Sequence, residues 1–245
     1  MTSTDAASTD TNSTQAVADR QLPAGLPPEL FAHAQQSDPI EFDLLDRTWD
    51  LLPGVWPPYI SPETKGFTDW LPYPEGGSLL EVGSGCGVTS VIAALRGVGQ
   101  VTALDITQEA VDNTLLNAAR HGVADHVRAL RSDMFAALDP DERFDVIYWD
   151  SNALLAPDDF TYTHYMQRAI MDPGYAAHRS FLVDGPRYLA DGGRLFLGFN
   201  DHGDWDKLAE LEQEAGLTRT ELGVLEFVSN GSTANFRLLE YRTHG

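Results

Sequence analysis

From residue 79 onward, short apolar runs alternate with longer segments in which apolar residues recur every three or four positions. The short runs predict strands and the longer periodic segments predict helices. The expected strands cover residues 79–82, 100–105, 126–131, 144–149, 193–199, 218–228 and 234–242. The expected helices cover residues 87–96, 107–121, 133–138, 174–190 and 204–215. This alternation predicts an α/β fold with a mostly parallel sheet, helices on both faces and one antiparallel strand from the closing pair.

The chain before residue 78 has a different composition. Residues 1–22 are mostly Ser, Thr, Asp, Ala and Asn, so they cannot bury enough apolar surface to become ordered, and we expect a disordered tail. Residues 23–77 predict an N-terminal helical cap near the mouth of the site, although the same segment would equally serve as a packing extension. Its expected elements are helices at 29–34, 43–52 and 63–71, with a stiff proline-rich loop at 53–62. Residues 78–245 form the predicted catalytic domain.

The net charge of −21 restricts the expected partners. No basic run occurs, and a strongly acidic surface repels phosphate backbones, so we expect no nucleic acid and a small, neutral or cationic substrate. The same acidity would also serve solubility alone. The sequence has no apolar run as long as a membrane span, and its N-terminus has no signal-peptide pattern, so no membrane partner is expected. A single cysteine, Cys86, favours a cytoplasmic location, whereas the oligomeric state is not predicted.

A glycine turn follows the first strand of the predicted sheet. Glycines at 83, 85 and 87 separate that strand from an apolar helix. Such a turn presents bare backbone N–H groups and a helix N-terminus to a ligand, although a tight turn without a ligand has the same pattern. A dinucleotide fingerprint needs a third glycine where Val88 stands, which weakens a nicotinamide or flavin interpretation.

Polar residues at the next strand ends predict a nucleoside site. Asp105 follows Gly87 by eighteen positions, close to the spacing at which an acid accepts both ribose hydroxyls. Ile106 is placed to pack on adenine, Asp133 to accept its amino group, and Met134 to lie against the ring. Both acids could instead cap the helices that follow them.

Residues 79–150 resemble the core of class I S-adenosylmethionine (SAM)-dependent methyltransferases, and in detail the HemK-type or small-domain branch. The similarity rests on Glu81 with its three glycines, on the stretches 103–107 and 117–122, and on the loop 53–56. The resemblance implies a Rossmann-like seven-stranded sheet and SAM as the cofactor. The expected cofactor contacts are Glu81, Gly83, Gly85, Gly87, Asp105, Ile106, Asp133, Met134 and Asp150.

The chain departs from that branch at the end of the fourth strand. The branch has Asn-Pro-Pro-Tyr there, whereas this chain has Asp150-Ser151-Asn152-Ala153. The missing prolines and aromatic ring make methylation of glutamine, adenine or guanine doubtful. Asp150 could orient or deprotonate a substrate ammonium, and Asn152 offers an uncharged donor and acceptor.

The segment 154–174 is long for a connection between a strand and a helix, and we expect it to cover the acceptor site. Its aromatic residues, with those nearby, suit a sulfonium cation. We expect Asp150, Asn152 and Tyr165 to be catalytic, and Trp56, Tyr162 and His178 to bind substrate. A structural role for His178 is the alternative. No cluster of residues has metal-ligand spacing, so no metal is expected.

The expected function is SAM-dependent transfer of a methyl group to a small molecule, with an amine or amino-acid-like metabolite preferred. Such a transfer depends mainly on holding nucleophile, methyl carbon and sulfur collinear. Three alternatives remain open at this point: cyclisation of SAM to azetidine-2-carboxylate with release of methylthioadenosine, N5-methylation of protein glutamine, and SAM binding without catalysis.

Overall fold

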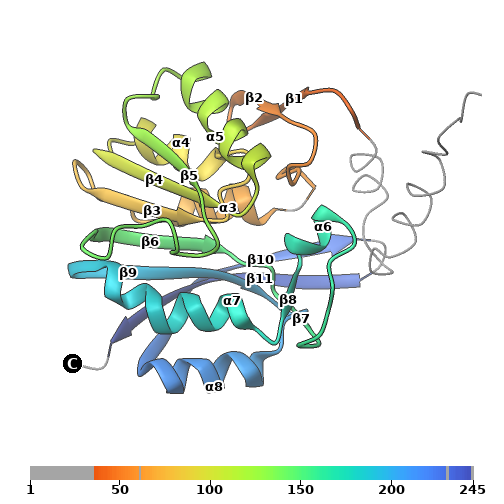
Figure 1. Cartoon of the computed structure of the whole chain (residues 1–245), viewed down its shortest axis with the longest axis vertical. Helices are drawn as coiled ribbons and strands as arrows, with labels where there is room; N and C mark the ends of the chain where they lie inside the picture. The colour runs from red at the N-terminus through yellow and green to blue at the C-terminus, as the bar shows by residue number, and fades with distance from the viewer. Residues whose placement is uncertain (1–35, 61, 230–231, 244–245) are drawn as a thin grey trace, which may run out of the picture.

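The computed structural model describes residues 36–60, 62–229 and 232–243. Its centre is a seven-stranded sheet of order β10-β11-β9-β6-β3-β4-β5 (Figure 1). The strands are β3 (Ser78–Val82), β4 (Gln100–Asp105), β5 (Val127–Arg131), β6 (Phe144–Asp150), β9 (Leu189–Asn200), β10 (Leu217–Ser229) and β11 (Ser232–Thr243). Within this sheet β11 alone runs against the others. The predicted fold class, including one antiparallel strand, is confirmed.

Helices cover both faces of the sheet because side chains alternate along each strand. Leu79 packs with α3 (Glu63–Trp70), α4 (Val88–Leu95) and α5 (Gln108–Arg120) in one core. Its neighbour Leu80 lies in a second core with α8 (Trp205–Ala215) and the helical segment 176–188. That segment consists of α7 (Ala176–Arg179), a π-helical turn η1 (Ser180–Asp184) and a 3-10 turn η2 (Gly185–Tyr188). Figure 1 shows α7 and α8 beside β9, away from α4 and α5.

The predicted helix at 43–52 is wrong. This stretch belongs to an antiparallel hairpin of β1 (Ile40–Leu44) and β2 (Arg47–Leu51). Leu45 and Asp46 form its turn with φ of 53° and 57°, the conformation that two-residue hairpin loops require. Inward-facing and outward-facing residues alternate from Ile40 onward, and this strand pattern determines the structure. The apolar content of 43–52, which suggested a helix, does not. The helix expected at 29–34 and the tail at 1–22 lie outside the described residues.

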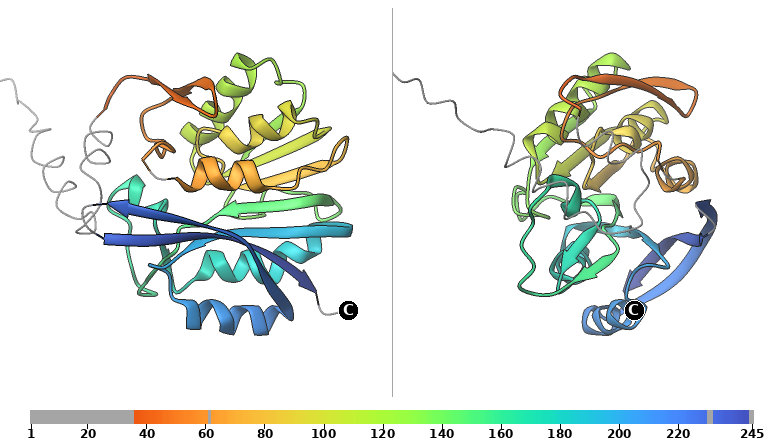
Figure 2. Two further views of the ribbon diagram at one scale, coloured as in Figure 1. Left: turned by 180° about the vertical axis from the view of Figure 1, so that it is seen from behind. Right: turned by 90° about the vertical axis from the view of Figure 1, so that its right-hand side faces the viewer.

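Two buried asparagines of α5 hold the hairpin in place. Figure 2 shows the hairpin beside this helix. Asn117 Oδ1 accepts the backbone N–H of Asp50 at 2.8 Å, and Asn113 Oδ1 accepts that of Leu52 at 2.8 Å. Asn117 Nδ2 also donates to the carbonyls of Asp50 and Cys86, at 2.9 and 2.8 Å. One side chain thus joins the hairpin to the glycine turn, which fixes the N-terminal segment beside the predicted cofactor site.

The segment 154–174 contains a small parallel pair, β7 (Leu154–Ala156) and β8 (Met171–Pro173), with α6 (Tyr165–Arg168) between them. The helix expected at 133–138 is wrong, because these residues form turns and Met134 has a φ of 46°. Ser132 holds the turns: its Oγ donates to the Met134 carbonyl at 2.6 Å and accepts the Ala137 N–H at 3.0 Å. Among the described residues, no helix is both long and apolar enough to cross a bilayer.

Candidate active site

A cavity of about 1260 Å³ opens where β3, β4 and β6 end. Its volume exceeds the usual range for a single small ligand, so a cofactor and part of an acceptor fit together. Its walls contain twelve of the residues that the sequence indicated: Trp56, Glu81, Gly83, Gly85, Asp105, Ile106, Asp133, Met134, Asp150, Asn152, Tyr162 and Tyr165. Gly87 and His178 do not line it. Among the described residues, no group of three His, Cys, Asp or Glu side chains is placed to hold a metal.

The glycine turn has the backbone conformation that its sequence suggests. Gly83, Gly85 and Gly87 have φ of 66°, 55° and 83°, a region that residues with a Cβ rarely adopt. A Cβ on Gly87 would lie 2.8 Å from the Cα of Thr114 in α5. Gly87 therefore allows α4 and α5 to pack closely, while Gly83 and Gly85 present backbone to the cavity.

Asp105 stabilises this turn. Its Oδ2 accepts the backbone N–H of Gly85 at 3.0 Å, and its Oδ1 accepts the N–H and hydroxyl of Thr107, each at 3.0 Å. Thr107, and not Asp105, caps α5, because its Oγ1 accepts the N–H of Ala110. Burial raises the pKa of Asp105. The acid is thus held in place at the end of β4, beside the nucleoside part of the predicted site.

Three carboxyl groups gather at the other end of the turn. Burial raises the pKa of Asp150 well above its ordinary value, and the charges of Glu63 and Glu81 raise it further. Burial likewise raises the pKa of Glu81 to about 7, although Ser90 Oγ donates to its Oε2 at 2.5 Å. A sulfonium or ammonium cation would relieve this repulsion and restore the ionised forms. The sequence interpretation did not include Glu63 among the site residues. Its position directly after a proline-rich loop was the only available indication that it could lie at the site.

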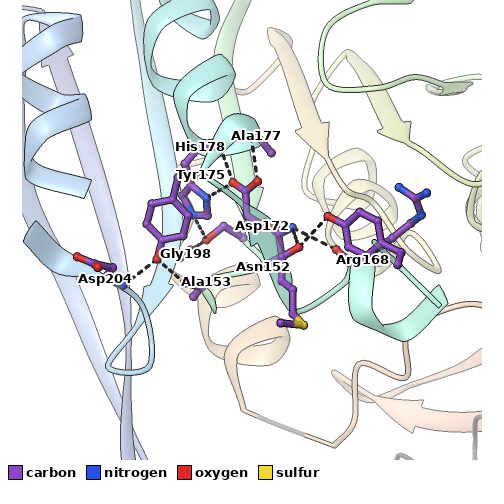
Figure 3. Close-up of polar contacts among 12 residues, drawn as sticks. Asn152, Ala153, Arg168, Asp172, Tyr175, Ala177, His178, Gly198 and Asp204 are labelled. Atoms are coloured by element: carbon purple, nitrogen blue, oxygen red, sulfur yellow. Dashed lines mark hydrogen bonds and ion pairs between the residues drawn. The ribbon is translucent and has the colours of Figure 1, made fainter. Parts of the chain in front are cut away.

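The acceptor end of the cavity has two polar atoms without partners. Asn152 Nδ2 donates to the carbonyls of Arg168 and Met171, at 3.2 and 2.9 Å (Figure 3). Its Oδ1 is buried and has no hydrogen-bond partner among the described residues, and the same holds for the hydroxyl of Tyr165. Burial raises the pKa of Tyr165 to about 12, so this hydroxyl stays a donor. Asn152 and Tyr165 both line the cavity, and each has one buried polar atom that no described residue satisfies.

His178 is fully buried behind the cavity wall. Its Nδ1 lies 2.7 Å from Oδ2 of Asp172, and its Nε2 lies 3.0 Å from Oγ of Ser151. Ser151 and Asp172 both line the cavity, whereas His178 does not. Burial lowers the pKa of His178, and Asp172 opposes that effect. The sequence interpretation missed Ser151 and Asp172, which carry no signal apart from their contact with this histidine.

Comparison with known proteins agrees with this geometry. Residues 79–174 match the family described as a methyltransferase domain. The release factor glutamine methyltransferase of Cereibacter sphaeroides is 30% identical over 169 residues, 66% of this chain and 60% of that protein. The ribosomal protein L11 methyltransferase of Syntrophotalea carbinolica is 40% identical over 84 residues, 33% of this chain and 26% of that protein. The chain thus spans at most about three fifths of either relative.

A solved 16S rRNA N2 methyltransferase from T. thermophilus, in complex with AdoMet and guanosine, shares the fold with a TM-score of 0.61. It is 19% identical, and the match covers 84% of this chain and 50% of that one. The fold, the glycine turn and the family match over residues 79–174 together show that the chain contains a methyltransferase domain of the class I SAM-dependent type, with SAM as its cofactor. Its sequence relatives include proteins of the HemK type, as the sequence predicted.

The prediction of a small-molecule partner and of no nucleic acid is wrong. The curated relatives are named for a release factor and a ribosomal protein, and the solved neighbour for an rRNA. The prediction relied on a net charge of −21, which is a sum over the whole chain. Such a sum does not describe the surface at one cavity, and Arg168 lies on the wall of this one. The cytoplasmic location, the domain boundaries and the site roles stay predictions.

Proposed function

We propose that the protein transfers the methyl group of SAM to a nitrogen atom of a protein side chain. The observation that carries this proposal is the buried Oδ1 of Asn152, two residues after the end of β6. The amide nitrogen of Asn152 must face the carbonyls of Arg168 and Met171, because both of these are acceptors. The oxygen therefore faces away from them, and a buried acceptor of this kind requires an N–H donor.

A protein acceptor suits the wall around Asn152. Tyr162 and Tyr165 line the cavity, and the guanidinium of Arg168 lies 4.3 Å from the centre of the Tyr162 ring. Flat aromatic walls accommodate a planar group such as a side-chain amide. The curated relatives named for a release factor and for ribosomal protein L11 support an acceptor of the same class. The side-chain amide of glutamine is therefore the first acceptor to test.

Each group at the site has a role in this transfer. Bound SAM supplies a methyl group on a sulfonium. Gly83, Gly85 and Asp105 hold the cofactor, and the carboxylates of Asp150 and Glu81 favour its positive charge. Asn152 orients the acceptor nitrogen by accepting one of its N–H groups. Holding the reacting atoms in line is the main source of acceleration for a displacement of this kind.

The test uses SAM labelled on its methyl group and a bacterial extract separated into protein, RNA and small-molecule fractions. We expect label in the protein fraction, and mass spectrometry should place it on a side-chain nitrogen. Asn152→Ala should lower kcat/KM for the labelled protein by about 10- to 100-fold, because it removes one or two hydrogen bonds between uncharged groups. Asn152→Asp, which keeps the acceptor oxygen but loses the donors, serves as the matched variant. SAM affinity should stay within twofold in both.

Two results would contradict this function. Label confined to RNA or to small molecules would exclude a protein acceptor. Release of methylthioadenosine without any extract would mean that SAM is itself the substrate, and Asn152 would then have another role.

A further inference from the structure

Ser151, His178 and Asp172 form a continuous hydrogen-bonded chain that runs from the cavity wall into the core. Ser151 directly follows β6, Asp172 lies on β8, and His178 lies on α7. The distances are 3.0 Å from Ser151 Oγ to His178 Nε2 and 2.7 Å from His178 Nδ1 to Asp172 Oδ2. Figure 3 shows the imidazole between the Tyr175 ring and the carboxylate of Asp172.

The hydrogen bonds of Asp172 determine which imidazole nitrogen carries the proton. Asp172 Oδ1 accepts the backbone N–H of Ala177 at 3.1 Å, and Oδ2 accepts that of His178 at 2.9 Å. A carboxylate with this set of donors accepts from Nδ1 as well, so Nδ1 must carry a hydrogen. In the neutral ring, Nε2 is then an acceptor, and it faces the hydroxyl of Ser151.

The network is complete whether the ring is neutral or protonated. Ser151 Oγ lies 2.8 Å from the Gly198 carbonyl as well as 3.0 Å from His178 Nε2. With a neutral ring, the hydroxyl donates to Nε2, and the Gly198 carbonyl still accepts the Ser151 N–H at 3.2 Å. With a protonated ring, Nε2–H donates to Oγ and the hydroxyl turns to the carbonyl. No polar atom of the chain loses its partner when a proton arrives.

The surroundings keep water away and leave few charges near the ring. Trp149, Tyr175 and Phe199 contact the imidazole, with ring centroids 4.8, 4.3 and 5.5 Å away. The hydroxyl of Tyr175 is engaged with the Ala153 carbonyl and the Asp204 N–H.

Charged groups lie on several of the elements around the ring. Asp172 on β8 contacts the imidazole directly, and Asp150 on β6 precedes Ser151. On α7, Arg179 is paired with Glu214 of α8. Because burial lowers the pKa of His178, the ring starts neutral and able to accept a proton.

We propose that Ser151, His178 and Asp172 form a proton relay that accepts the proton released by methyl transfer. This inference rests on the proposed function, since it needs an acceptor N–H at the cavity wall. The acceptor nitrogen forms a bond to the methyl carbon while the carbon–sulfur bond breaks and its electron pair goes to sulfur. The proton on the alkylated nitrogen passes to Ser151 Oγ as the serine proton passes to Nε2. Asp172 stabilises the imidazolium, which returns the proton to solvent after product release.

The first test needs no acceptor. Nitrogen NMR of protein labelled with ¹⁵N-histidine reports the tautomer of His178, assigned by the loss of one signal in His178→Asn. At pH 7 we expect hydrogen on Nδ1 and none on Nε2, and Asp172→Asn should disturb this tautomer. A ring with hydrogen on Nε2 in the neutral protein would overturn the relay.

The second test is the pH profile of transfer to the labelled protein fraction, at saturating SAM between pH 5.5 and 9. Wild-type kcat should rise with pH through one inflection as His178 loses its proton. Ser151→Ala and His178→Asn should lower kcat by about 100-fold, within the usual effect of a general base, and should abolish the inflection. Ser151→Thr, which keeps the hydroxyl, should retain both the wild-type kcat and the inflection. SAM affinity should stay within twofold in all variants.

The outcomes separate the two proposals. An unchanged inflection in Ser151→Ala and His178→Asn, even with lower kcat, would show a structural role and overturn the relay alone. If the wild-type enzyme transfers no methyl label to any protein in the extract, the proposed function and the relay are both overturned, whatever the tautomer of His178.

Discussion

The backbone N–H of Gly85 donates to Oδ2 of Asp105 across 3.0 Å, so the turn after β3 is tied to the acid that ends β4. The two residues lie twenty positions apart and meet because β3 and β4 are parallel neighbours. In the proposed function this turn forms the cofactor cradle, and the bond sets its shape before any ligand arrives. A cradle arranged in advance binds more tightly because less ordering is needed on binding.

The first prediction concerns this bond. Asp105→Ala should weaken SAM binding by about 10- to 100-fold, because hydrogen bonds to a charged group contribute roughly 1.5–3 kcal/mol. Isothermal titration calorimetry with SAM measures the change. Asp112→Ala on the exposed face of α5 is the matched control and should bind as the wild type does. Equal affinities in the two variants would show that Asp105 does not hold the cofactor.

The second prediction separates the packing role of Gly87 from backbone strain. Gly87→Ala should lower the free energy of unfolding by about 2–4 kcal/mol, because a strained φ adds to a contact with the α5 backbone. Gly122→Ala has a similar φ of 73° but no atom within 4 Å of the new Cβ. It should therefore cost only about 1–2 kcal/mol. Chemical denaturation of both variants measures the difference, and equal losses would contradict the close approach of α4 and α5.

The third prediction is a pH dependence of stability caused by Glu81. Its carboxyl keeps a proton up to about pH 7 in the folded protein, compared with an ordinary value of 4.5. Between these values the folded state binds more protons than the unfolded state, so stability falls as pH rises. The expected loss attributable to this group is about 3 kcal/mol between pH 4.5 and pH 7.

Glu81→Gln isolates this contribution. The variant keeps an oxygen for Ser90 to donate to but has no titrating proton, so its stability should vary less with pH. Denaturant unfolding without SAM at pH 5, 6, 7 and 8 makes the comparison. Parallel curves for the two proteins would show that Glu81 titrates at its ordinary value.

The fourth prediction uses two buried tyrosine hydroxyls. The hydroxyls of Tyr148 and Tyr165 both lack a partner among the described residues, but only Tyr165 lines the cavity. Removing an unsatisfied buried hydroxyl should raise stability by up to about 1 kcal/mol in each Phe variant. Tyr165→Phe should also raise KM for the protein acceptor several-fold, whereas Tyr148→Phe should not. Melting temperatures and steady-state kinetics test this. Identical kinetics in the two variants would show that Tyr165 does not contact the acceptor.

The sequence determined the features whose causes are local. Strands at 79–82 and 144–149 follow from short apolar runs, and the turn at 83–87 follows from glycines that alone adopt its φ values without strain. Asp105, Asp150 and Asn152 were found because parallel strands bring their carboxyl ends to one edge. The prediction of a helix at 43–52 was wrong because the cause there is not local to the apolar pattern. A two-residue turn and pairing with a second strand determine its structure instead.

The tertiary structure decided what depends on residues far apart in the chain. Asn117 reaches Asp50 across 67 positions, and His178 reaches Ser151 across 27. Neither pair has a pattern that one sequence displays, because each contact arises from the packing of whole helices on the sheet. The same holds for the clustered carboxyls of Glu63, Glu81 and Asp150, where burial raises the pKa of Glu81 and of Asp150. A single sequence identifies the cofactor cradle through local backbone chemistry, but the proton path and the acceptor wall exist only once distant elements have packed.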